Sequence, residues 1–167
     1  NPDLCVDVGR SFATQLLDPM HETFGSVTVR SGYRSPSLNS YGNENKLNCA
    51  RNVYPGECHI WDRGVGEARI GGASIVIPWF ADQYDQGRDW RDLAWWMHDH
   101  LPYSDIWFFP KLAAFNLVWR ATPLRTISSY IAPRGMLLKA GQDPCEDIGQ
   151  RQHRYADFPP FRGINYP

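Results

Sequence analysis

The chain has 167 residues, of which 43% are hydrophobic and 14% aromatic, and seven of them are tryptophan. This composition is typical of one globular domain with a substantial core, and it excludes a disordered chain. The net charge of −1 gives no electrostatic reason to expect nucleic acid or an anionic membrane surface as a partner. No run of apolar residues is long enough to predict a membrane-spanning helix.

The first part of the chain predicts two helices and a strand. Apolar residues recur at helical spacing over residues 3–17. Pro19 then begins a second short helix, which Gly25 ends, because proline suits the first turn of a helix and glycine suits its end. A β-branched run predicts a strand at residues 27–30. The Asn- and Gly-rich residues 41–57 predict a long loop.

The second part predicts one further helix and most of a sheet. Residues 82–87 are expected to form a turn, and residues 89–100 form the clearest helix, with Asp89 as its N-cap. Four residues of this helix share one face: Leu93, Trp96, Met97 and His100. Further strands are predicted at residues 71–78, 105–109, 114–120 and 125–131. The sequence therefore predicts an α+β fold, in which helices pack on one face of a small antiparallel sheet.

The composition changes after residue 140, which divides the chain into a domain, residues 1–140, and a C-terminal arm, residues 141–167. The arm is rich in proline and poor in aliphatic residues, so it cannot form a core of its own. It is either a disordered tail or an extended arm. Its aromatic residues favour an arm that packs, and self-association through a neighbouring subunit is expected; they are Tyr155, Phe158, Phe161 and Tyr166.

The four cysteines give no zinc-ribbon pattern, because no Cys-x-x-Cys pair occurs. Cys49 and Cys58 flank one loop and could form a disulfide, and Cys145 could attach the arm to the domain. Free thiols, including that of Cys5, are an equally good interpretation.

The most informative segment is residues 27–39, VTVRSGYRSPSLN. Here a strand ends in a turn. Gly32 lets the backbone turn sharply, and Pro36 favours an extended conformation for the residue before it. Such a turn can hold Arg34 in one orientation, and a fixed guanidinium is a bidentate receptor for a carboxylate. The alternative is an ordinary surface arginine after a strand.

The histidines give one candidate metal ligand. His59 follows the long loop, and loops on rigid scaffolds often carry functional residues. The alternative is a loop histidine that hydrogen-bonds to the backbone. His98 and His100 are two residues apart on a helix, so their side chains point in different directions and are better explained as helix capping. His21 and His153 carry no signal of a site.

The order of helix, LLDPMHETFG, strand and SGYRSPSLN resembles the VanY-type D-alanyl-D-alanine carboxypeptidases and the hedgehog-type zinc peptidases, including phage-associated endopeptidases. The resemblance covers roughly residues 3–132 and leaves the arm unmatched. It implies that Arg34 binds substrate, with Ser31 and Tyr33 from the same block beside it. It also implies a zinc site formed by two histidines and an aspartate.

The chain departs from the family at most of the implied zinc ligands. Residues 57–59 correspond to the family's Ser-x-His motif, so His59 matches the first ligand. Ile75 stands where the family has its aspartate, and Asn116 stands where it has its second histidine. Isoleucine cannot bind a metal, and a neutral asparagine is a poor zinc ligand. Asp62 and Glu67, which lie in an insertion, are possible replacement ligands.

We therefore expect a peptidase-like domain whose zinc site is degenerate. Its expected role is non-catalytic, as a binding or structural component of an assembly such as a phage virion, with protein partners and no cofactor. The alternative is a zinc-dependent peptidase that cleaves cell-wall (peptidoglycan) peptides with a non-standard ligand set. In that case His59 binds zinc, Arg34 holds the peptide carboxylate, and a metal-bound water attacks the carbonyl. The expected location is the virion or the extracellular space.

Overall fold

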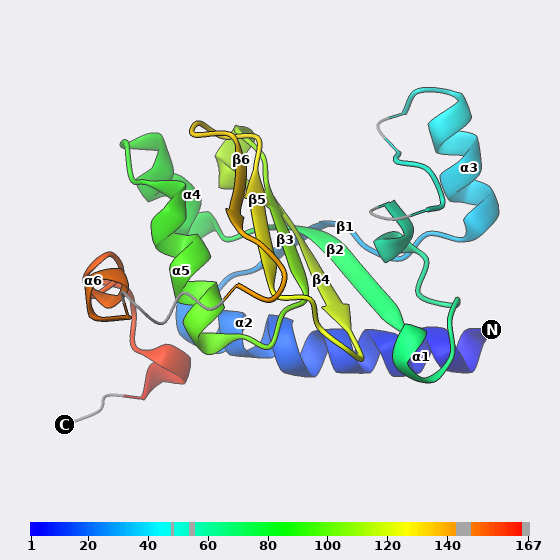
Figure 1. Ribbon diagram of the computed structural model, residues 1–167, viewed down its shortest axis with the longest axis horizontal. Helices are drawn as coiled ribbons and strands as arrows, with labels where there is room; N and C mark the ends of the chain where they lie inside the picture. Colours follow the sequence, from blue (N-terminus) through cyan, green and yellow to red (C-terminus); the bar gives the residue numbers. More distant parts are fainter. Residues whose placement is uncertain (48, 54–55, 143–147, 165–167) are drawn as a thin grey trace.

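In a computed structural model, which describes residues 1–47, 49–53, 56–142 and 148–164, the chain begins with a long continuous helical rod (Figure 1). The rod consists of α1 (Pro2–Phe12), the π-helical η1 (Ala13–Leu17) and α2 (Asp18–Phe24). Proline lacks an N–H, and its ring clashes with the carbonyl four residues earlier. The wider π turn lies just before Pro19, so the helix continues where the sequence predicted a new one. Gly25 ends the rod at φ 80°, as predicted.

The sheet has six strands in the order β1-β2-β4-β3-β5-β6. Their bounds are β1 (Thr28–Ser31), β2 (Ile70–Val76), β3 (Asp105–Phe108), β4 (Phe115–Arg120), β5 (Thr126–Ser129) and β6 (Gly135–Leu138). The α+β class is confirmed. The prediction of an antiparallel sheet is wrong at one place, because β3 and β5 pair in parallel.

The parallel pair follows from the position of β4. This strand is antiparallel to both β2 and β3, and it lies between them, so neither of its edges is open. The chain that leaves β4 turns back and joins the sheet at the free edge of β3. A strand that runs opposite to β4 runs in the same direction as β3.

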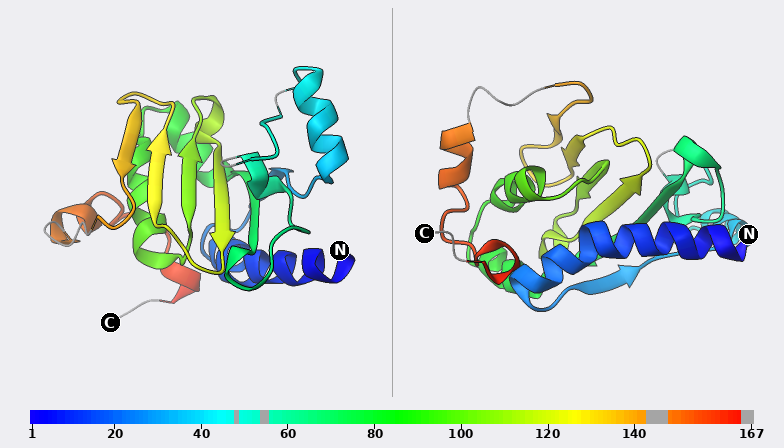
Figure 2. Two further views of the ribbon diagram at one scale, coloured as in Figure 1. Left: turned by 45° about the vertical axis from the view of Figure 1, so that its right-hand side comes forward. Right: turned by 90° about the horizontal axis from the view of Figure 1, so that it is seen from below.

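The helices cover one face of the sheet, as predicted (Figure 2, left). Besides the rod, they are α4 (Pro78–Asp85) and α5 (Trp90–His100). The rod contributes an apolar stripe at intervals of four residues: Val8, Phe12, Leu16, Met20 and Phe24. Alternate strand residues meet this stripe and the buried face of α5; they include Ile106, Phe108, Phe115 and Leu117.

Two α-helices and one strand within residues 1–140 were not predicted. The helix α3 (Pro36–Glu44) replaces the first part of the predicted loop, because Ser35 is a helix N-cap whose Oγ accepts a hydrogen bond from the Leu38 N–H at 3.3 Å. The helix α4 has a proline in its first turn and replaces the first part of the turn predicted at residues 82–87, of which residues 86 and 87 do form a turn. The short edge strand β6 begins at a glycine with φ 118°.

The arm packs on its own domain. It contains α6 (Ile148–His153) and η6 (Phe161–Gly163), so the prediction of an extended arm is corrected for these residues. Phe158 is only 8% exposed, and its ring lies against Phe24 and Trp79, with centroid distances of 5.9 and 5.1 Å. The aromatic residues pack as predicted, but on the helices of the same chain. Tyr166 lies outside the described residues.

The described thiols are free: Cys5, Cys49 and Cys58 form no disulfide, so the bridge considered between Cys49 and Cys58 is absent. Cys145 lies outside the described residues. Within the described part of the chain, no helix combines the length and the apolar character that a membrane crossing requires.

Candidate functional site

We call the face of the sheet opposite the helices the open face (Figure 2, left). Strand register places one row of residues across it: Ser74, Asn116, Trp107, Ser128 and Met136. The Oγ of Ser74 donates a hydrogen bond to the Oδ1 of Asn116 at 2.6 Å. This pair is neutral and polar, while further along the same face Arg120 and Asp105 form an ion pair at 3.2 Å.

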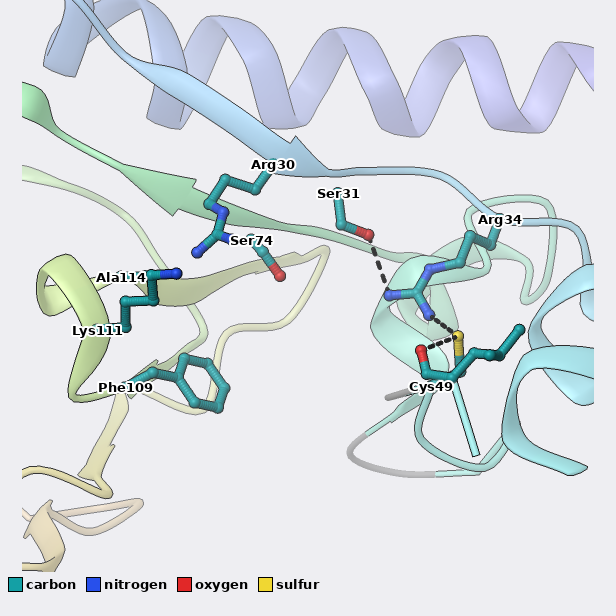
Figure 3. A pocket seen from close by; sticks show the side chains of 9 residues that line it. Arg30, Ser31, Arg34, Cys49, Ser74, Phe109, Lys111 and Ala114 are labelled. Atoms are coloured by element: carbon teal, nitrogen blue, oxygen red, sulfur yellow. Dashed lines mark hydrogen bonds between the residues drawn. The ribbon is translucent and has the colours of Figure 1, made fainter. Parts of the chain in front are cut away.

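A groove of about 530 Å³ opens at the β1–β2 end of this face (Figure 3). It is bounded by β1 and β2, by the chain around α3, and by η4 (Lys111–Ala113) with the residues that flank it. Its lining residues are Arg30, Ser31, Arg34, Leu47, Cys49, Ser74, Phe109, Lys111 and Ala114. Three of these are cationic and none is acidic. The groove therefore favours an anionic ligand.

Arg34 is held in one orientation by neutral groups. Its Nη1 donates to the Oδ1 of Asn39 at 2.8 Å and to the Sγ of Cys49 at 3.0 Å. Its Nη2 donates to the Oγ of Ser31 at 3.1 Å. Its backbone N–H also donates to the carbonyl of His59 at 2.7 Å. The predicted turn does fix this guanidinium, and the side chain is half-buried rather than an ordinary surface arginine.

A buried amide network supports this orientation. Asn39 is fully buried, and its Nδ2 donates to the carbonyl of Ala50 at 2.9 Å and to the Oδ1 of Asn52 at 2.6 Å. Asn52 in turn donates to the carbonyl of Pro36 at 2.9 Å. The network connects α3 to the chain at residues 49–53. The acceptor that holds Arg34 is therefore itself fixed.

The other two cations of the groove lie apart from Arg34. Arg30 extends from β1 and Lys111 from η4, and both point into the groove near Ser74 (Figure 3). Among the residues that the structure describes, none of the three groove cations forms a salt bridge. Their positive charge is therefore not balanced within the groove.

His59 is buried next to this site, at the end of η2 (Gly56–His59). It is 5% exposed, and its Nδ1 lies 2.9 Å from the carbonyl oxygen of Gly32, so Nδ1–H is the donor. Burial, and then the nearby charge of Arg34, lower the pKa of His59 to about 4. The turn, the histidine and the arginine thus form one packed unit.

The candidate zinc ligands are not brought together. Among the described residues, no group of three His, Cys, Asp or Glu side chains is arranged to hold a metal ion, so His59, Asp62 and Glu67 do not form such a cluster. Asp62 lies beside Tyr33, whose pKa is raised by desolvation and by this carboxylate. Glu67 lies on the exposed η3 (Gly66–Ala68).

The two strand positions that the resemblance assigned to zinc ligands differ in orientation. Ile75 is fully buried and faces the helices. Asn116 faces the open side, where its partner is Ser74, the residue before Ile75. Side chains alternate between the two faces of a strand, so the polar Ser74 between apolar Ala73 and Ile75 could have indicated that Ser74, and not Ile75, reaches this face.

Of the three predicted substrate-binding residues, Ser31 and Arg34 line the groove. Tyr33 is 41% exposed and packs against Trp61, with 6.1 Å between ring centroids, outside the groove. Sequence reasoning missed Arg30 and Lys111. No local pattern joins these two residues, because the pairing of the strands alone brings β1 and η4 to one groove.

We compared the chain with models of protein families, with curated proteins and with solved structures, and none of the three comparisons gives a match. Function is therefore inferred from the geometry of the groove and from the sequence pattern.

Proposed function

We propose that this chain is a non-catalytic binding protein that holds a carboxylate-bearing peptide in the groove. The observation that carries the proposal is a set of three cationic side chains around one groove that no acidic residue lines. An oriented guanidinium binds a carboxylate with geometric specificity as well as charge.

Arg34 is the proposed anchor for the carboxylate. Its Nη2 carries two N–H groups, and Ser31 accepts only one hydrogen bond from it. The Oγ of Ser31 accepts that bond, so its own O–H remains able to donate to a ligand oxygen. Because Asn39 and Cys49 already fix the guanidinium, little side-chain entropy is lost when a ligand binds.

The neutral Ser74–Asn116 pair on the open face supports binding without hydrolysis. A hydrolytic zinc site needs three protein ligands and an open position, and the described residues hold no cluster of that kind. Ser74 and Asn116 instead satisfy each other. We infer that the domain acts as a binding or structural component of an assembly such as a phage virion, and that its ligand is a cell-wall (peptidoglycan) peptide.

The test is calorimetric titration with acetyl-D-Ala-D-Ala and with its C-terminal amide. We expect the acid to bind and the amide to bind about tenfold or more weakly, because a hydrogen bond to a charged group contributes about 1.5–3 kcal/mol. Arg34→Gln should remove the difference between the two ligands. Arg10→Gln, at an exposed site on α1, should leave it unchanged. Equal binding of acid and amide contradicts the proposal.

One observation favours the alternative, a zinc-dependent peptidase. The low pKa of His59 keeps its imidazole neutral at physiological pH, which is the form that binds a metal. Metal analysis of the purified protein, with mass spectrometry of the peptide after incubation, distinguishes the two functions. About one zinc per chain, and cleavage that is lost in His59→Gln, would establish the peptidase instead.

A further inference from the structure

The groove has two cationic ends. Arg34 lies at one end with Ser31 and Cys49, while Arg30 and Lys111 extend toward each other at the other end, near Ser74 (Figure 3). The two ends come from different parts of the chain: Arg34 from the turn after β1, and Lys111 from η4.

A single carboxylate on Arg34 leaves the second end unbalanced. Arg30 and Lys111 are both exposed, and neither forms a salt bridge within the described residues. Two like charges that point toward each other repel, and an anionic group between them turns this repulsion into two attractions. The hydroxyl of Ser74 donates to Asn116, so its oxygen can still accept a hydrogen bond but cannot donate one to the anion.

We propose that the ligand of this groove is a linear dicarboxylate, with one carboxylate on Arg34 and the second on Arg30 and Lys111. This inference rests on the proposed function and specifies its ligand class. Phe109 also lines the groove, and it offers an apolar surface to the part of the ligand that joins the two acidic groups. A peptide that carries a terminal carboxylate and a second acidic group farther along its chain has this chemistry.

The test compares acetyl-D-Ala-D-Ala with succinyl-D-Ala-D-Ala, whose acyl group carries a second carboxylate on one additional methylene at the amino end. We expect the succinyl peptide to bind about fivefold more tightly, because each of two exposed ion pairs contributes a modest amount. The gain should shrink as the salt concentration rises, since exposed charges are screened. Equal affinity of the two peptides for the wild-type protein would overturn the inference while leaving the proposed function intact.

Variants separate the two ends. In the double variant Arg30→Gln, Lys111→Gln, the succinyl gain should disappear while the preference for acid over amide remains. In Arg34→Gln, both peptides should weaken while the gain from the second carboxylate persists. Lys139→Gln removes an exposed lysine outside the groove and should change neither quantity. A succinyl gain that survives in the double variant would overturn the inference, and failure of the acetyl peptide to bind would instead refute the proposed function.

Discussion

Replacing Phe158 by alanine tests whether the C-terminal arm is part of the core. Its ring is 8% exposed and contacts three rings of the helical layer: Phe24, Trp79 and Phe80. The guanidinium carbon of Arg88 lies 5.0 Å from the ring centroid on its face. Truncation of a buried phenylalanine costs about 3–5 kcal/mol. Since this site lies at the edge of the core, we expect about 3 kcal/mol.

Urea unfolding followed by tryptophan fluorescence measures this loss. With a slope of about 2 kcal/mol/M, the midpoint should fall by about 1.5 M urea with little change in slope. The melting temperature should fall by about 6–12 °C. Met136→Ala is the control, because Met136 is 52% exposed and a surface change costs less than about 0.5 kcal/mol.

A loss of less than about 1 kcal/mol in Phe158→Ala would refute the packing of the arm on its own helices. The same reasoning changes an expectation from sequence. The division of the chain at residue 140, made from composition, implies a domain that folds without residues 141–167 and an arm that mediates self-association. Because Tyr155 and Phe158 belong to the core, we now expect the truncated domain to be markedly less stable. Whether the arm also mediates self-association stays a prediction, which the oligomeric size of the truncated protein tests.

The remaining predictions concern the packed unit behind the groove and the contact between α1 and β2. Folding lowers the pKa of His59 to about 4, so the unfolded state takes up a proton at a higher pH than the folded state does. The free energy of unfolding should therefore fall by about 3 kcal/mol as the pH drops from about 6.5 to 4. Urea midpoints should show a smaller fall in His59→Gln and an unchanged one in His153→Gln, which alters an exposed site. Asn39→Leu should cost about 2–3 kcal/mol, because it leaves the partners of a fully buried amide unsatisfied; an unchanged thermal midpoint contradicts the network. Gly71→Ala should destabilise the protein by about 1–3 kcal/mol, because a Cβ there would lie 2.4 Å from a methyl carbon of Val8. A denaturation curve like that of the wild type would show that α1 does not pack closely on β2.

Local patterns in the sequence determined the elements whose stabilising contacts are near in the chain. The helix at residues 90–100 begins after its N-cap Asp89, whose side chain accepts a hydrogen bond from Arg91, and its apolar residues Leu93, Trp96 and Met97 are buried as their spacing predicts. The α+β class, the adjacency of β3 and β4, and the fixed orientation of Arg34 also follow from local pattern. For the helix, one short segment contains both the signal and the groups that satisfy it. For Arg34, two of its three side-chain partners, Ser31 and Asn39, lie within five residues of it.

Long-range pairing decided the rest. The parallel alignment of β5 with β3 depends on β4 already occupying the other edge of β3, and the burial of Phe158 depends on the helices that lie beside the arm. The groove is the clearest case, because β1 and η4 meet only when the sheet assembles and brings Arg30 and Lys111 together. The sequence specifies the charges of Arg30 and Lys111, but only the order of the strands places them around one groove. The reason is that the residues lining the groove come from distant parts of the chain.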